Sequence, residues 1–180
     1  MRPFYLGALL LLGSRLALAD PLAAQLRAAG LTPVSPPAAA ADFDLPDTQG
    51  RRWRLAAQRG RVVFLNFWAT WCPPCVHEMP TMEALYQALR QRPFVLLAVN
   101  MQEDRARVAA FMAEHRLHFP ALLDAQGRVS DLYRVRGLPT TYLLDCGGHV
   151  VGHAVGPRPW GTPAVHALLA TLLADPRCQP

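Results

Sequence analysis

The chain of 180 residues contains no lysine: all 18 of its basic residues are arginine, and with 13 acidic residues the formal net charge is only +5. The arginines are scattered, and only Arg51, Arg52 and Arg54 cluster. No basic stripe is interleaved with aromatic residues, so the charge pattern gives no reason to expect nucleic-acid binding. Because hydrophobic residues make up 52% of the chain and charged residues only 17%, we expect a packed core rather than disorder.

Cysteine is also scarce, with four residues in the chain. Cys72 and Cys75 form a close pair, whereas Cys146 and Cys178 stand singly and far away. A structural zinc site needs four ligands, usually two such pairs, so the spacing argues against a metal. We expect neither a metal nor another cofactor.

Long hydrophobic runs are missing too. The apolar stretch Phe4 to Leu12 is followed by Arg15, well short of the ~20 residues of a membrane-spanning helix. With Arg2 before it and Ala17-Leu18-Ala19 after it, the pattern predicts a signal peptide over residues 1–19, with a membrane anchor as the less favoured alternative. We therefore expect a soluble protein in the periplasm, an oxidising compartment.

Residues 20–41 are rich in alanine and proline and predict an extended linker, with a short helix from Leu22 to Ala29 as an option at its start. The folded domain is expected over residues 42–180. Asp47 to Gly50 has the composition of a turn and predicts an N-terminal β-hairpin with Trp53 and Leu55 in its second strand.

Helical and strand patterns alternate through the rest of the chain. Two continuous apolar runs, 61–67 and 94–100, predict central strands that are buried on both faces. This order predicts an α/β fold with a mixed central sheet and helices on both faces. The remaining expected elements are helices at 73–89, 104–115, 128–133 and 163–173, and strands at 119–123, 140–145 and 149–155.

The sequence Trp71-Cys72-Pro73-Pro74-Cys75 lies between a buried strand and a helix. Unpaired amides and the helix dipole stabilise a thiolate at such a position, so Cys72 is the expected nucleophile and Cys75 the resolving thiol. A structural Cys72–Cys75 bridge is the alternative, but its loop is too small to stabilise the fold much. Pro73 and Pro74 offer no N–H group to the Cys72 thiolate. The Cys72–Cys75 dithiol is therefore expected to reduce client disulfides rather than to oxidise client thiols.

The segment Phe67 to Cys75 resembles the active site of thioredoxin-fold proteins. Together with Asp42 to Asp47, Glu78-Met79-Pro80 and Gly137 to Thr141, it resembles the exported TlpA/ResA-like thiol–disulfide reductases over about Asp42 to Leu173. The resemblance implies a thioredoxin-like fold with an inserted helix–strand unit at 104–123. It also implies disulfide-bearing client proteins, a membrane thiol electron donor of the DsbD/CcdA kind, and often a place in cytochrome c or copper-oxidase assembly.

The resemblance also assigns individual residues. Pro139 matches the family's cis-proline, and the backbone of Leu138 before it could pair with a substrate strand. Trp71 is expected to shield the cysteines and contact the substrate. Glu78 shares a helix face with Cys75 and could exchange its proton. Asn66 stands where cytoplasmic thioredoxins carry a buried acid, which favours Glu78 in that role.

Cys146 and Cys178 are expected at the pole of the domain opposite the active site, where they could form a structural disulfide; two free or intermolecular thiols are the alternative. Two other functions stay open at this point. One is a disulfide oxidase or isomerase, which differs by its reduction potential. The other is a chaperone that binds Cu(I) through Cys72 and Cys75, although no Met-rich or His-rich segment supports it.

Overall fold

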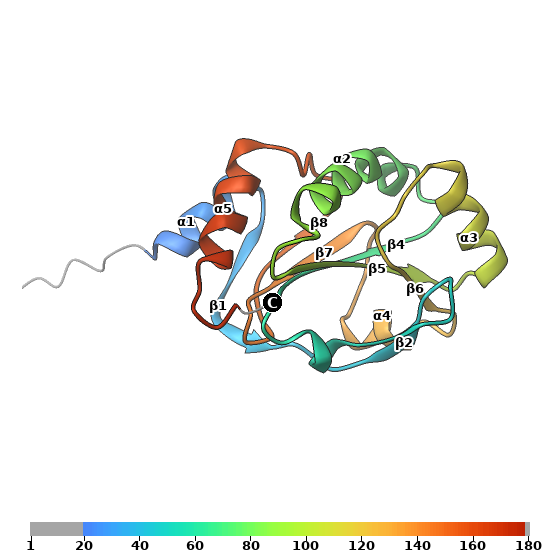
Figure 1. Ribbon diagram of the computed structural model, residues 1–180, viewed down its shortest axis with the longest axis horizontal. Coiled ribbons are helices and arrows are strands. Elements are labelled where there is room, and N and C mark those ends of the chain that lie inside the picture. Colours follow the sequence, from blue (N-terminus) through green and yellow to red (C-terminus); the bar gives the residue numbers. More distant parts are fainter. Residues whose placement is uncertain (1–19, 179–180) are drawn as a thin grey trace, which may run out of the picture.

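The computed structural model describes residues 20–178, which form a six-stranded mixed sheet with helices on both faces (Figure 1). The strand order is β1-β8-β7-β4-β5-β6. β4, β5 and β6 run parallel, and β7, β8 and β1 follow as antiparallel neighbours on the other side of β4. The strands are β1 (Thr32–Ala39), β4 (Val62–Trp68), β5 (Phe94–Met101), β6 (Ala121–Asp124), β7 (Thr140–Leu144) and β8 (His149–Val155).

The two faces of the sheet carry separate cores. One core packs against the helices α1 (Pro21–Ala28), α2 (Pro73–Leu89), α3 (Arg105–Glu114) and α5 (Pro163–Leu173). The other lies under α4 (Arg128–Leu132), the 3-10 helix η1 (Leu55–Gln58) and a hairpin of β2 (Asp44–Pro46) and β3 (Arg52–Arg54). The predicted α/β architecture with helices on both faces is confirmed.

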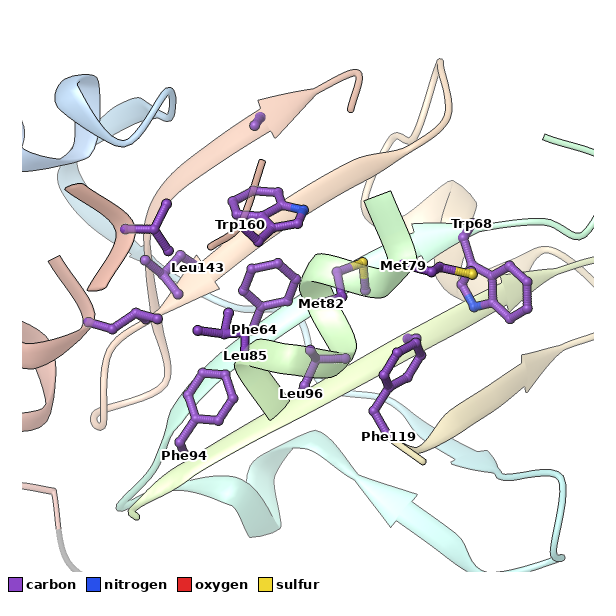
Figure 2. Packing of buried hydrophobic residues seen from close by; sticks show 14 of the residues in the cluster. Phe64, Trp68, Met79, Met82, Leu85, Phe94, Leu96, Phe119, Leu143 and Trp160 are labelled. Carbon is purple, nitrogen blue, oxygen red and sulfur yellow. The ribbon is translucent and has the colours of Figure 1, made fainter. Parts of the chain in front are cut away.

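Every residue of β4 is buried, as the apolar run predicts. Side chains alternate along a strand, so Phe64 and Trp68 join the core beneath α2 while Leu65 and Phe67 join the opposite one. Figure 2 shows the first of these cores, with Phe64 and Leu96 from the sheet facing α2. Asn66 falls on the same side of the strand as Phe64, so it also faces α2.

Residues 20–41 are not a linker. α1 buries Ala23 and Leu26 and packs beside α5, and β1 pairs antiparallel with β8 at the edge of the sheet. A proline-rich segment can form this strand because an edge strand needs hydrogen bonds on one side only. The sheet thus begins at Thr32, ten residues before the predicted start of the folded domain at residue 42. The predicted signal peptide, residues 1–19, lies outside the described residues.

The β2–β3 hairpin forms as predicted, with Trp53 opposite Leu45. Leu55, however, does not continue the strand: it starts η1, where it is buried against the sheet. Asp47 at the turn is buried and accepts hydrogen bonds from the backbone of Gln49 and Arg51 and from the Trp53 indole. The backbone of Asp47 also forms an antiparallel β-bridge with Leu122, which attaches the turn of the hairpin to β6.

Candidate active site

The paired cysteines lie where β4 ends and α2 begins. Cys72 is the N-cap of α2, and its Sγ accepts a hydrogen bond of 3.3 Å from the amide of Cys75. The two are joined by a disulfide, with their Cα atoms 5.3 Å apart. Pro73 and Pro74 occupy the first helical positions and have no N–H group, so the first amide available to the Cys72 sulfur is that of Cys75.

A groove of about 440 Å³ opens beside Cys72. One side is formed by Trp71, Cys72 and the two prolines, and the other by residues 135–138. Trp71 is 63% exposed, whereas only 4% of Cys72 reaches the surface. The exposed indole and the small sulfur surface at the groove suit a polypeptide segment that approaches Cys72 from solvent.

The peptide bond between Leu138 and Pro139 is cis, as the resemblance implies. Pro139 is buried, and its carbonyl accepts a hydrogen bond of 2.8 Å from the amide of Gly156. Leu138 is half-buried and lines the same groove as Cys72. The structure therefore brings Leu138 and Cys72 together across the groove, although 66 positions separate them in the sequence.

Glu78 lies one turn along α2 from Cys75, and only 2% of it is exposed. Its carboxylate accepts three hydrogen bonds: from Asn66 Nδ2 at 2.9 Å, from the Arg158 amide at 3.0 Å and from Trp160 Nε1 at 2.9 Å. Burial raises the pKa of Glu78 above its ordinary value, although the hydrogen bonds from these three donors act in the opposite direction. A carboxylate whose pKa is raised is a better proton acceptor than an ordinary carboxylate, and the resulting acid can return the proton.

Comparison with known proteins gives the family. Residues 36–153 match the AhpC/TSA family model. The thiol-disulfide oxidoreductase ResA of Geobacillus thermodenitrificans (strain NG80-2) is 44% identical over 119 residues, 66% of this chain and 68% of that protein. ResA of Bacillus subtilis (strain 168) is 40% identical over 128 residues, 71% of this chain and 72% of that protein. This chain belongs to the ResA-like thiol–disulfide oxidoreductases of the AhpC/TSA family.

Comparison with solved structures supports the same family. A thiol:disulfide interchange protein of the thioredoxin family from Chlorobium tepidum TLS superposes with a TM-score of 0.67 at 26% identity, covering 78% of this chain and 99% of that one. The oxidoreductase thus has the thioredoxin-like fold, and it is a redox enzyme. Within residues 20–178, no helix has the length and apolar character to cross a membrane.

The oxidoreductase also contains a polar network that the sequence analysis did not find. Glu103 accepts hydrogen bonds from the Thr70 amide at 2.7 Å, from the Thr70 hydroxyl and from Asn100 Nδ2 at 2.7 Å, and it forms an ion pair with Arg107 at 2.9 Å. Burial raises the pKa of Glu103, but the hydrogen bonds from Thr70 and Asn100 and the charge of Arg107 lower it overall. The network holds the loop between β4 and Cys72 against the end of β5.

One feature of the sequence could have pointed to this network. Asn100 is the polar residue next to the end of the otherwise apolar strand β5 and is fully buried, and a buried polar side chain needs a partner. Glu103, three residues later, is the nearest acid in the sequence. Its contact with Thr70 depends on β4 and β5 lying side by side, which sequence spacing does not reveal.

Cys146 and Cys178 lie far from the groove in the oxidoreductase. They are joined by a disulfide, with their Cα atoms 5.2 Å apart. Cys146 follows β7 and is buried, while Cys178 follows α5. Beside the disulfide, Arg177 forms an ion pair of 2.9 Å with Asp145, so the segment after α5 is held to the β7–β8 turn at two points.

Proposed function

We propose that the protein reduces disulfides of client proteins, with Cys72 as the nucleophile. The observation that carries this proposal is the position of Cys72: the N-cap of α2, with its sulfur at a groove shared with Leu138. The N-terminal end of a helix favours a thiolate there. A client strand in the groove could pair with the backbone of Leu138 and bring its own sulfur to Cys72.

The reaction has two exchanges. The Cys72 thiolate attacks one sulfur of the client disulfide, a mixed disulfide forms, and the other client sulfur leaves as a thiolate. The Cys75 thiolate then attacks the Cys72 sulfur, which forms the Cys72–Cys75 disulfide and releases the second client thiolate. Two electrons pass from the protein to the client, and the product is the disulfide seen in the structure.

Glu78 supplies the proton transfer in the second exchange. Cys75 must lose its proton before it can attack, and it is buried away from solvent. Glu78 is three residues further along the same helix, on the same face. Its carboxylate takes the Cys75 proton, and it can return that proton when the pair is reduced again.

Reduction is the direction that the two prolines support. The reduced form of a strongly oxidising couple is stabilised by groups around the nucleophilic thiolate. Here Pro73 and Pro74 remove two amides that could do so, which leaves the Cys75 amide at 3.3 Å. A couple with a less stabilised thiolate has a lower reduction potential.

The proposed biological setting is based on the N-terminal sequence and on the resemblance to exported TlpA/ResA-like reductases. If residues 1–19 direct export, the enzyme works in the periplasm, where thiols tend to become oxidised. It then needs a membrane thiol donor of the DsbD/CcdA kind to regenerate the dithiol. Its clients would include proteins whose cysteines must be reduced during cytochrome c or copper-oxidase assembly.

The test is a measurement of reductase activity and potential. We expect the wild type to reduce insulin and Cys72→Ser to be inactive, while Cys75→Ser holds clients as mixed disulfides on Cys72. Equilibration with glutathione should give a potential nearer the about −270 mV of thioredoxin than the about −120 mV of a strong oxidant. A potential at the oxidising end, or insulin reduction by Cys72→Ser, would refute the proposal.

A further inference from the structure

Trp160 is the least expected member of the site. It belongs to the loop between β8 and α5, 82 positions from Glu78, and it is 1% exposed. In such a position a tryptophan ordinarily serves as a core residue, and Trp160 does pack edge-on against Phe64, with ring centroids 4.7 Å apart (Figure 2). Its indole N–H, however, points at the one buried acid on α2 and donates to Glu78 Oε2 at 2.9 Å.

Trp160 is held in this place by contacts of its own. Its backbone amide donates to Thr81 Oγ1 at 3.3 Å, and the Thr81 hydroxyl donates to the carbonyl of Glu78 at 2.7 Å. The loop is therefore attached to α2 by three hydrogen bonds: the Trp160 indole and the Arg158 amide donate to the carboxylate, and the Trp160 amide donates to the Thr81 hydroxyl. The indole has little freedom to turn away from Glu78.

The three donors approach the two oxygens of the Glu78 carboxylate from two different elements. Asn66 holds Oε1 from the sheet, and the Arg158 amide and Trp160 hold Oε2 from the loop. Hydrogen bonds to both oxygens fix the orientation of the group and stabilise its charged form against burial. The Trp160 bond is the most specific to remove, because Arg158 donates from its backbone and Asn66 Nδ2 also donates to Thr141 Oγ1.

We propose that Trp160 is a positioning residue for thiol–disulfide exchange, whose indole N–H holds the Glu78 carboxylate in the orientation and charge state in which it accepts the Cys75 proton. This inference rests on the proposed role of Glu78. Trp160 touches neither client nor sulfur in this scheme and acts only through the carboxylate. Without its indole N–H, the anion keeps two donors and becomes harder to form.

Other titratable groups around Glu78 are few in the part of the chain that the structure describes. Arg158 contributes a positive charge that lowers the pKa of Glu78, and His77 lines the same small hollow of about 210 Å³. Cys75 lies one turn earlier on α2. Asn66 on β4 and Thr81 on α2 are neutral, so Cys75 and His77 are the other titratable groups to consider. Following the Glu78 carboxyl itself by NMR distinguishes it from both.

The test follows the two exchanges separately. The reduced protein is mixed in a stopped-flow instrument with dithiobis-nitrobenzoate: Cys72 releases the first coloured thiolate and Cys75 the second. For the wild type, we expect the rate of the second phase to fall on the acid side as Glu78 is protonated. For Trp160→Phe, this fall should move to higher pH, with a rate about threefold to tenfold lower below the midpoint and a nearly unchanged plateau at high pH.

A matched control comes from the hairpin. Trp53 donates its indole N–H to Asp47 at 2.9 Å, so Trp53→Phe removes the same kind of bond from a different carboxylate. Its second-phase profile should coincide with that of the wild type. If Trp160→Phe does not fold, replacing the Trp160 indole with its benzothiophene isostere removes the N–H and keeps the shape.

Two readouts separate the proposals. The carbon-13 shift of the Glu78 carboxyl, followed by NMR across pH, should titrate at higher pH in the Trp160 variants than in the wild type. An unchanged midpoint, or a second phase slowed equally at every pH, would overturn the role of Trp160. If instead Glu78→Gln keeps both the rate and the acid-side fall, the proposed role of Glu78 itself fails, whatever the Trp160 titration shows.

Discussion

At the scale of single residues, the site depends on two buried carboxylates with opposite properties. Glu78 has a raised pKa because burial outweighs its three donors, and Glu103 has a lowered pKa because its partners outweigh burial. Glu78 is therefore a better proton acceptor than an ordinary carboxylate, while Glu103 stays charged at neutral pH and holds Thr70 in place. The first suits proton transfer and the second suits a fixed scaffold.

Glu103→Gln should destabilise the protein by about 1 to 3 kcal/mol at neutral pH, because Thr70, Asn100 and Arg107 lose a charged acceptor. A lowered folded-state pKa stabilises the fold above the unfolded value of 4.5, and that contribution is lost as pH falls through the folded pKa. The difference in Tm between wild type and variant should therefore shrink as pH is lowered from about 7 to about 3. A difference that stays constant over this range would contradict the assigned charge state.

The sequence predicted the proposed reactive residues better than the residues that hold them in position. Cys72 and Cys75 stand in one contiguous motif, and the resemblance to the TlpA/ResA-like proteins assigned the cis-proline to Pro139; the structure contains the Cys72–Cys75 disulfide and the cis bond before Pro139. Glu103 and Trp160 reach the site through contacts between distant segments. Such contacts depend on which strands become neighbours, and a single sequence carries little information about that.

At the scale of elements, β1 shows why composition misled the prediction. Its prolines and alanines suggested a linker, yet Leu26 and Leu31 on either side of the turn before it are buried. A strand at the sheet edge tolerates proline because one side of its backbone needs no partner. The two apolar residues, rather than the prolines, decide that the segment folds onto the domain.

Removal of residues 20–41 should therefore lower stability by several kcal/mol, since full burial of each leucine contributes about 1.5 to 3 kcal/mol and the β8 edge also loses its partner. Thermal unfolding of a chain that starts at Asp42, compared with one that starts at Asp20, measures this. Equal Tm values for the two chains would restore the linker interpretation.

The disulfide after α5 makes a second element-scale prediction. Cys146 and Cys178 are separated by 32 positions, and cross-linking a loop of this length stabilises by about 3 to 4 kcal/mol. Cys146→Ser combined with Cys178→Ser should lose about this much in urea unfolding, while insulin reduction at moderate temperature is retained. Loss of the reductase activity in a folded double variant would show that the second pair takes part in electron transfer.

At the scale of the whole molecule, the pH dependence of stability is the sum of contributions from several carboxyl groups. Asp47, Glu83 and Glu103 have lowered pKa values, so their contributions are present above the unfolded values of 3.8 and 4.5 and are lost in acid. The contribution of Glu78 to stability depends on pH in the opposite direction. Its raised folded-state pKa favours the fold below the unfolded value of 4.5, and this contribution disappears as pH rises through the folded pKa.

The opposite sign can be measured with Glu78→Gln. As pH is lowered from about 7 to about 4, the Tm of the wild type should improve relative to that of the variant, because only the wild type takes up a proton at this site. Glu103→Gln measured in parallel should show the reverse trend. Parallel Tm curves for wild type and Glu78→Gln would mean that the Glu78 carboxyl titrates alike in the folded and unfolded chains.

The proline-rich edge has one more consequence. An enzyme that receives extended polypeptide segments must avoid extending its own sheet with them, because an open strand edge pairs with any such chain. At one end β1 presents Pro33, Pro36 and Pro37, which lack the N–H groups that a new strand would need. At the other end the turn at Asp47 and Thr48 bonds to β6 and blocks that edge. In the proposed mechanism, an incoming chain therefore pairs with the backbone at Leu138, beside Cys72, instead of extending the sheet.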